Sequence, residues 1–178
     1  HLSDRKFAGA DTLATSNALA GALRTLEYDI IITGRQAIDG DTAQVGPQIA
    51  EHLDIPQVTY VEEVTVKQNN KLLIKKATEE GYQMLEVTTP CLLTVLSTAG
   101  KSRYMTVRGI VKAYTRDVEV WGADNIEVDE TKLGLKGSPT RVSKSFTKGA
   151  KAAGQIYEVD TQEAVDIIVE KLKEKFII

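Results

Sequence analysis

Residues 29–54 read Asp-Ile-Ile-Ile-Thr-Gly-Arg-Gln-Ala-Ile-Asp-Gly-Asp-Thr-Ala-Gln-Val-Gly-Pro-Gln-Ile-Ala-Glu-His-Leu-Asp, and this stretch decides the fold. Its apolar start, 29–33, predicts a buried strand, and its end, from Ile49, has a helical pattern. A glycine-bearing turn, 34–47, joins the two. Because the first N–H groups of a helix lack intrahelical partners, such a turn is where an open α/β sheet binds a nucleotide. This turn is therefore the first candidate site.

The composition limits the class of protein. The chain has 178 residues, 42% of them hydrophobic, which is enough for one good core, and its formal net charge is −3. An acidic total argues against a nucleic-acid partner bound by bulk electrostatics. One cysteine, Cys91, excludes an internal disulfide, and two histidines allow no zinc-type cluster. No apolar run is as long as a membrane span. We expect a soluble, cytoplasmic protein with no metal site.

The remaining pattern predicts an α/β unit followed by a less regular part. Residues 11–27 predict an amphipathic helix with Asp11 as its N-cap. Because an α/β unit normally begins with a strand, we expect that an upstream segment is missing from this sequence. Alternation from Val58 to Thr88 predicts a small antiparallel meander with a tight turn at Asn69-Asn70. The apolar run 91–96 predicts a strand that is covered on both faces.

Beyond Trp121, the sequence predicts an extended arm that runs through several glycines and Pro139. It closes in an amphipathic helix whose apolar stripe includes Val165 and Leu172, with Asp160 and Glu163 giving a start like a capping box. This terminal helix belongs either to the core or to a contact with another subunit.

Two predicted helix starts resemble each other, Gly9-Ala10-Asp11-Thr12 and Gly40-Asp41-Thr42-Ala43. Side by side at the carboxyl edge of a parallel sheet, they can hold a pyrophosphate between them. The charges of Asp39 and Asp41 oppose this, unless Asp41 caps its own helix and Asp39 faces a ribose or the protein. The alternative, that both are ordinary caps with no ligand, stays open at this point.

Pro47 makes a helix that begins at Asp41 unfavourable, because its interior would lack one hydrogen bond. The helix therefore begins near Pro47, or its first turns are distorted. In both cases several N–H groups between Gly40 and Gly46 need partners outside the helix.

No pair of nucleophile and base stands out in the sequence. His52 lies in a helical pattern and is interpreted as a surface residue, and Cys91 as a small core residue. We therefore assign no catalytic residue and expect a bound cofactor to carry any difficult chemistry.

The segment 101–116 interleaves basic and apolar side chains. It is interpreted as a solvated helix face, a nucleic-acid surface or a docking surface for an acidic protein. Apolar anchors rimmed by cations are typical of docking surfaces, so we favour the third interpretation.

With these residues in view, the chain resembles the β (small) subunit of electron transfer flavoproteins. Asp29–Pro47 resembles that family's adenine-nucleotide loop, and Lys76–Val95 its signature region. Residues 103–113 resemble its recognition loop for dehydrogenases, and Gly137-Ser138-Pro139-Thr140 with Phe146 its C-terminal arm. The likeness covers essentially the whole chain, except that the family's N-terminal strand and adjoining helix are absent.

The resemblance implies a Rossmann-like nucleotide-binding parallel sheet of α/β class, with the meander and a C-terminal arm ending in a helix. It implies a nucleotide-binding domain at 1–116 and, at 117–178, an arm and helix that pack on the partner subunit. That partner is an α subunit with its own FAD. In the conventional branch the β subunit holds AMP, and in the electron-bifurcating branch it holds a second FAD that accepts electrons from NADH.

The resemblance also implies site residues. The cofactor-binding residues are Asp11, Thr12, Thr15, Gly34, Arg35, Gln36, Ala37, Ile38, Asp39, Gly40, Asp41, Thr42, Ala43, Gln44, Val45, Gly46 and Pro47. The partner-recognition residues are Arg103, Tyr104, Val107, Arg108 and Lys112.

The small residues near Gly40 and Thr42 resemble the bifurcating branch. We therefore expect FAD as cofactor, NADH as electron donor, and delivery both to ferredoxin or flavodoxin and, through the α-subunit FAD, to a dehydrogenase. One alternative is a conventional β subunit with a structural AMP. A second is a stand-alone regulatory domain of the universal-stress type that binds ATP.

Overall fold

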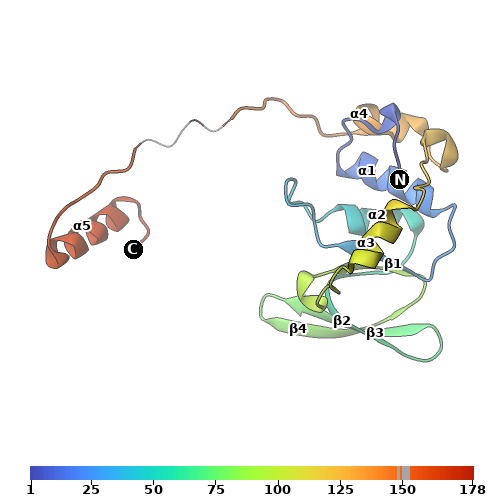
Figure 1. Cartoon of the computed structure of the whole chain (residues 1–178), viewed down its shortest axis with the longest axis horizontal. Helices are drawn as coiled ribbons and strands as arrows, with labels where there is room; N and C mark the ends of the chain where they lie inside the picture. Colours follow the sequence, from blue (N-terminus) through green and yellow to red (C-terminus); the bar gives the residue numbers. More distant parts are fainter. Residues whose placement is uncertain (148, 150–152) are drawn as a thin grey trace. The chain divides into compact units, whose positions relative to one another are not determined.

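A five-stranded mixed sheet in the order β1-β5-β2-β3-β4 forms the centre of the first part of the chain (Figure 1). The structure is a computed structural model that describes residues 1–147, 149 and 153–178. The chain divides into two units, His1–Arg141 and Val142–Ile178, which are described separately below.

The parallel part of the sheet consists of β1 (Ile30–Gly34), β5 (Cys91–Val95) and the first half of β2 (Gln57–Val66). β5 lies between the other two and pairs with both in parallel. It is buried along most of its length, as its continuous apolar character predicts. Gly34 pairs with Val95, so β1 and β5 end together at the carboxyl edge of the sheet.

The antiparallel meander consists of the second half of β2, β3 (Lys71–Thr78) and β4 (Gly81–Thr88). Asn69 and Asn70 turn the chain with φ values of 61° and 56°, which confirms the predicted hairpin. A register shift in β2 between Val61 and Glu63 separates the two halves of the sheet. The meander's apolar side chains form one core cluster with Cys91 and Leu93.

Two helices, α1 (Thr12–Leu23) and α2 (Val45–Leu53), form the layer against the parallel strands (Figure 1). Ile49 and Ala50 of α2 are buried with Ile31 and Leu92 of the sheet. α2 begins at Val45, so Pro47 lies in its first turn, where its missing N–H costs no helix hydrogen bond. The first of the two sequence-based alternatives for this helix is therefore confirmed.

Residues 121–141 pack on α1 and belong to the first unit. The short helices η1 (Arg5–Phe7), η3 (Ala123–Asn125), η4 (Glu130–Lys132) and α4 (Gly134–Gly137) lie in this layer. Ala123, Ile126 and Leu133 are buried against small residues of α1, namely Ala18 and Ala22.

This packing differs from one expectation. α1 is apolar on two sides, towards α2 and towards 121–133, so the simple amphipathic pattern was wrong. The two compact units divide at Arg141.

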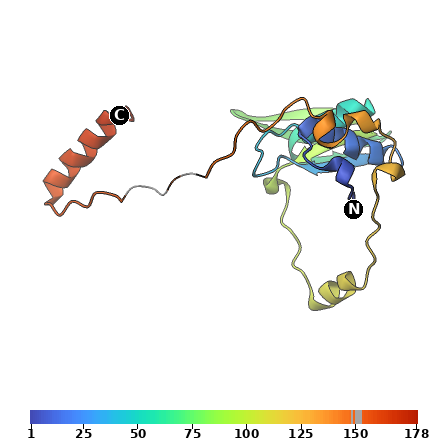
Figure 2. The same ribbon diagram turned by 90° about the horizontal axis from the view of Figure 1, so that it is seen from above.

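Residues 100–120 form an exposed excursion of the first unit that carries α3 (Val107–Tyr114) (Figure 2). It follows η2 (Ser97–Ala99) and ends where Trp121 forms a parallel bridge with Leu2. The backbone N–H of Trp121 donates to the carbonyl of His1 at 2.8 Å, which fixes this end.

The second unit contains α5 (Thr161–Glu174), capped by the Asp160 carboxylate, which accepts from the N–H groups of Gln162 and Glu163. Residues 148 and 150–152 of the predicted arm lie outside the described residues. Within the described parts of the chain, no helix is long and apolar enough to cross a membrane.

Candidate functional site

A groove of about 490 Å³ lies where the start of α1 meets the loop that leads into α2. It brings together many of the residues predicted to bind a cofactor. These are Asp11, Thr12 and Thr15 from α1 and its cap, and Ala37, Asp39, Gly40, Thr42, Ala43, Gln44 and Val45 from the loop. The structure adds Ala10 and Thr140, which sequence reasoning did not assign to the site.

The loop that lines this groove contains backbone N–H groups without a hydrogen-bond partner among the described residues. Across the described residues, no hydrogen bond engages the N–H groups of residues 42–46. Ala43 has a left-handed φ of 52°, and the following Gln44 is right-handed. Such an alternation turns successive N–H groups to one side and makes a concave site for an anion. The sequence-based prediction that N–H groups between Gly40 and Gly46 need outside partners is thus confirmed.

Asp41 does not cap α2, so the condition under which its charge would be turned away from a phosphate is not met by a helix cap. The N-cap residue is Gln44, which makes no side-chain cap hydrogen bond, and the Asp41 carboxylate instead accepts from the Gln36 amide. The physical reason is the late start of α2 at Val45, which leaves Asp41 four residues ahead of the helix. Asp39 is exposed and lines the groove.

Seven of the predicted residues do not line the groove, namely Gly34, Arg35, Gln36, Ile38, Asp41, Gly46 and Pro47. Arg35 instead lies over the ring of Tyr60, with its guanidinium carbon 5.9 Å from the ring centroid. Ile38 is fully exposed.

Gly46 has a structural role behind the groove. A Cβ at this position would lie 2.7 Å from Thr94 Cγ2 and 2.9 Å from Thr33 Oγ1. The absence of a side chain therefore lets the first turn of α2 lie directly on β1 and β5. The Thr33 hydroxyl oxygen is buried with no hydrogen-bond partner among the described residues.

Two side-chain contacts tie the two helices together. Thr12 Oγ1 donates to Gln44 Oε1 at 2.9 Å, which joins the starts of α1 and α2 at the groove. Deeper between the helices, His52 Nε2 lies 3.2 Å from Oγ of the fully buried Ser16. Burial, with Arg24 and Lys132 nearby, lowers the pKa of His52. The structure places His52 half-buried between the helices, so its interpretation as a surface residue was wrong.

The Asp11 carboxylate accepts three hydrogen bonds at the groove. Its Oδ1 accepts from Ala14 N–H at 3.0 Å, and its Oδ2 accepts from Thr140 N–H at 3.1 Å and Thr140 Oγ1 at 2.8 Å. Burial acts to raise the pKa of Asp11, but the hydrogen bonds outweigh it and the pKa is lowered. Asp11 is therefore ionised at neutral pH.

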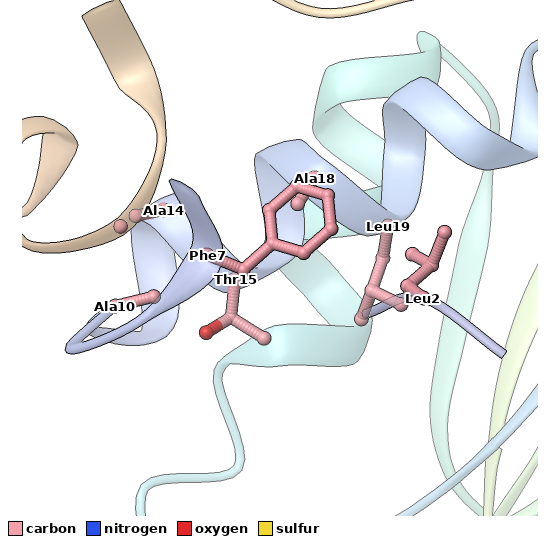
Figure 3. A pocket seen from close by; sticks show the side chains of 8 residues that line it. Leu2, Phe7, Ala10, Ala14, Thr15, Ala18 and Leu19 are labelled. Carbon is pink, nitrogen blue, oxygen red and sulfur yellow. The ribbon is translucent and has the colours of Figure 1, made fainter. Parts of the chain in front are cut away.

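A second, mostly apolar cavity of about 270 Å³ lies beside the start of α1 (Figure 3). Figure 3 shows Leu2 and Leu19 next to each other at one end of this cavity and Ala10 at the other. Ala10 and Thr15 line both the cavity and the groove.

The predicted recognition residues lie on the excursion. Arg103 and Tyr104 precede α3, and Val107, Arg108 and Lys112 lie on it, all exposed. A hollow of about 470 Å³ is lined by the apolar or small residues Met105, Gly109, Ile110, Ala113 and Tyr114 together with Thr106. α3 thus combines an apolar side with basic side chains and has no buried residue of its own.

Comparison with known proteins identifies the family of this chain. Residues 1–126 match the family described as "Electron transfer flavoprotein domain". This match covers more than half of the chain, so the chain belongs to the electron transfer flavoprotein family.

The relatives place it more narrowly, among the β subunits of that family. The chain is 55% identical to the electron transfer flavoprotein subunit beta of Clostridium acetobutylicum over 98% of its own length and 67% of the relative. It is 51% identical to the protein of that name from Thermoanaerobacterium thermosaccharolyticum (99% and 68%). It is 45% identical to the caffeyl-CoA reductase-Etf complex subunit CarD of Acetobacterium woodii (99% and 68%).

Proposed function

We propose that this chain is the β subunit of a heterodimeric electron transfer flavoprotein and binds an adenine dinucleotide, FAD, in the groove. The observation that carries this proposal is the run of N–H groups at residues 42–46 that have no hydrogen-bond partner among the described residues, at the positive end of α2, where residues 42–45 line the groove. These donors fit a pyrophosphate, because each N–H finds no acceptor within the described protein and the groove is large enough to admit one.

The other groove residues have complementary roles. Thr12 and Thr15 would add hydroxyl groups at the start of α1, and Asp39, which lines the groove, would accept from a ribose hydroxyl. When bound, FAD would take two electrons from NADH and hand them on singly, which no side chain of this site can do. The chain's own residues bind and orient the cofactor, and none is assigned a proton-transfer step.

Open space around Gly40 favours FAD over the alternative, AMP. A Cβ at Gly40 would meet nothing within 4 Å, so the loop leaves room beside the groove at this residue. Small residues on this side let a ligand larger than a mononucleotide approach the backbone.

The partners follow from the exposed surfaces and from the names of relatives. α3 would dock a dehydrogenase through its apolar side and basic rim, and 117–178, above all its second unit, would pack on the α subunit. Apolar residues of α5, such as Val165 and Ile168, are half exposed within that unit and need a cover. The relative whose name contains a reductase-Etf complex supports electron delivery to an acyl-CoA-type reductase. Ferredoxin or flavodoxin would accept the second electron.

Gly40→Leu tests the groove. The new side chain has space in the protein but projects beside the ligand site, so we expect a folded heterodimer that loses most of its β-subunit nucleotide and its reduction by NADH. The measurements are the nucleotide retained after gel filtration and anaerobic titration with NADH. Gly100→Leu is the matched control, because Gly100 has an extended φ of 179° and equally open space outside the groove. Full nucleotide retention in Gly40→Leu would contradict the proposed site.

A further inference from the structure

A negatively charged side chain at the groove raises a question about anion binding. Asp11 lines the same groove as the loop N–H groups and is ionised. An unshielded carboxylate beside a phosphate is unfavourable, because like charges at close range repel strongly in a partly buried site. If the groove takes an anionic ligand, other groups of the protein must therefore offset the charge of the Asp11 carboxylate.

The groups that hold it come from the far end of the first unit. Thr140 donates both its N–H and its hydroxyl to Oδ2, 129 residues away in sequence, while Oδ1 caps α1 through Ala14. Ser138 Oγ accepts from the Asp11 N–H at 2.8 Å. We call Asp11, Ser138 and Thr140 the Asp11 latch.

Burial and hydrogen bonding of Ser138 hold the Asp11 latch in place. Ser138 is 6% exposed, and its hydroxyl donates to the Gly134 carbonyl at 2.7 Å. Gly134 itself is in close contact with the backbone of η1, since a Cβ there would meet the Lys6 carbonyl oxygen at 2.3 Å. Ser138, two residues before Thr140, is thus anchored to Gly134, which itself packs on the backbone of η1.

We propose that Thr140 is a positioning residue of the nucleotide site, which acts through Asp11. By donating two hydrogen bonds to Oδ2, it turns and shields the carboxylate, so that the groove accepts a phosphate beside an acidic residue. This inference rests on the proposed function, because it concerns the same groove.

The test compares ligands with and without a phosphate. The probes are ADP and adenosine, titrated calorimetrically into nucleotide-stripped heterodimer. Loss of a hydrogen bond to the carboxylate in Thr140→Val should weaken ADP binding about fivefold and leave adenosine binding unchanged. Thr140→Ser keeps the hydroxyl and should bind ADP like the wild type. Thr131→Val is the matched control, because Thr131 donates to Asp129 in the same way but away from the groove.

A second variant separates shielding from simple loss of structure. Asp11→Asn keeps a good N-cap but removes the charge, so in the Thr140→Val background it should restore ADP binding. Equal loss of ADP and adenosine binding in Thr140→Val, or no rescue by Asp11→Asn, would overturn the latch. ADP binding that is unchanged in Thr140→Val would do the same while leaving the proposed function intact. A wild-type heterodimer that binds neither probe would overturn both.

Discussion

Gly46 is the residue at which the first turn of α2 packs directly on the sheet. Because Thr33 and Thr94 are β-branched and stiff, they cannot easily move away from an added methyl group. Gly46→Ala should therefore lower the free energy of unfolding by about 1–3 kcal/mol through overpacking. Urea denaturation of the purified protein measures this, with Gly40→Ala as the control in open space, where we expect a change within about 0.5 kcal/mol. Equal shifts in the two variants would rule out the contact.

Local chemistry explains which residues were predictable. The hairpin at Asn69-Asn70 and the Asp11 cap depend on neighbours within a few positions, and both were predicted from the sequence. Thr140 was missed as a groove residue because its partner is 129 positions away, and no local pattern encodes that contact. Gly21, whose Cβ would lie 2.8 Å from the Glu127 carbonyl oxygen, was a signal that another backbone lies against α1.

The helix α3 is exposed along its whole length, and its apolar side offers a surface to a partner. Val107, 78% exposed, is its first residue, so Val107→Asp removes an apolar anchor without loss of core and even suits a helix start. We expect loss of electron delivery to the partner dehydrogenase, while NADH oxidation with an artificial acceptor continues. Steady-state assays of both activities measure this.

Val118→Asp is the matched control for that variant. Val118 is 71% exposed and lies on the same excursion but outside α3. Both activities should persist in it. If Val107→Asp lost both activities together, α3 would not be a docking element.

The elements differ in how far sequence predicts them. Strands and helices with clear apolar periodicity, such as β5 and α2, were predicted in type and order. The layer formed by 121–141 was expected to be an extended arm, because its short turns of helix carry no periodic signal and are held by packing on α1.

In the whole molecule, the starts of α1 and α2 and the loop before α2 meet at a single groove, and α3 lies on the separate excursion. The parallel strands put the loop at the carboxyl edge of the sheet, where nucleotides bind in open α/β proteins. The proposed cofactor groove and the proposed docking surface thus lie on different segments of the chain. Sequence periodicity predicted the strands at 29–33 and 91–96 and the meander, but not the order in which the strands pair.

Nucleotide content separates a dinucleotide site in this chain from an AMP site. Purified heterodimer is denatured, and the released FAD and AMP are separated by chromatography and counted against protein. We expect two FAD and no AMP for each heterodimer, with one of the two FAD lost in Gly40→Leu. One FAD together with one AMP would contradict the proposed dinucleotide site and leave a conventional electron carrier.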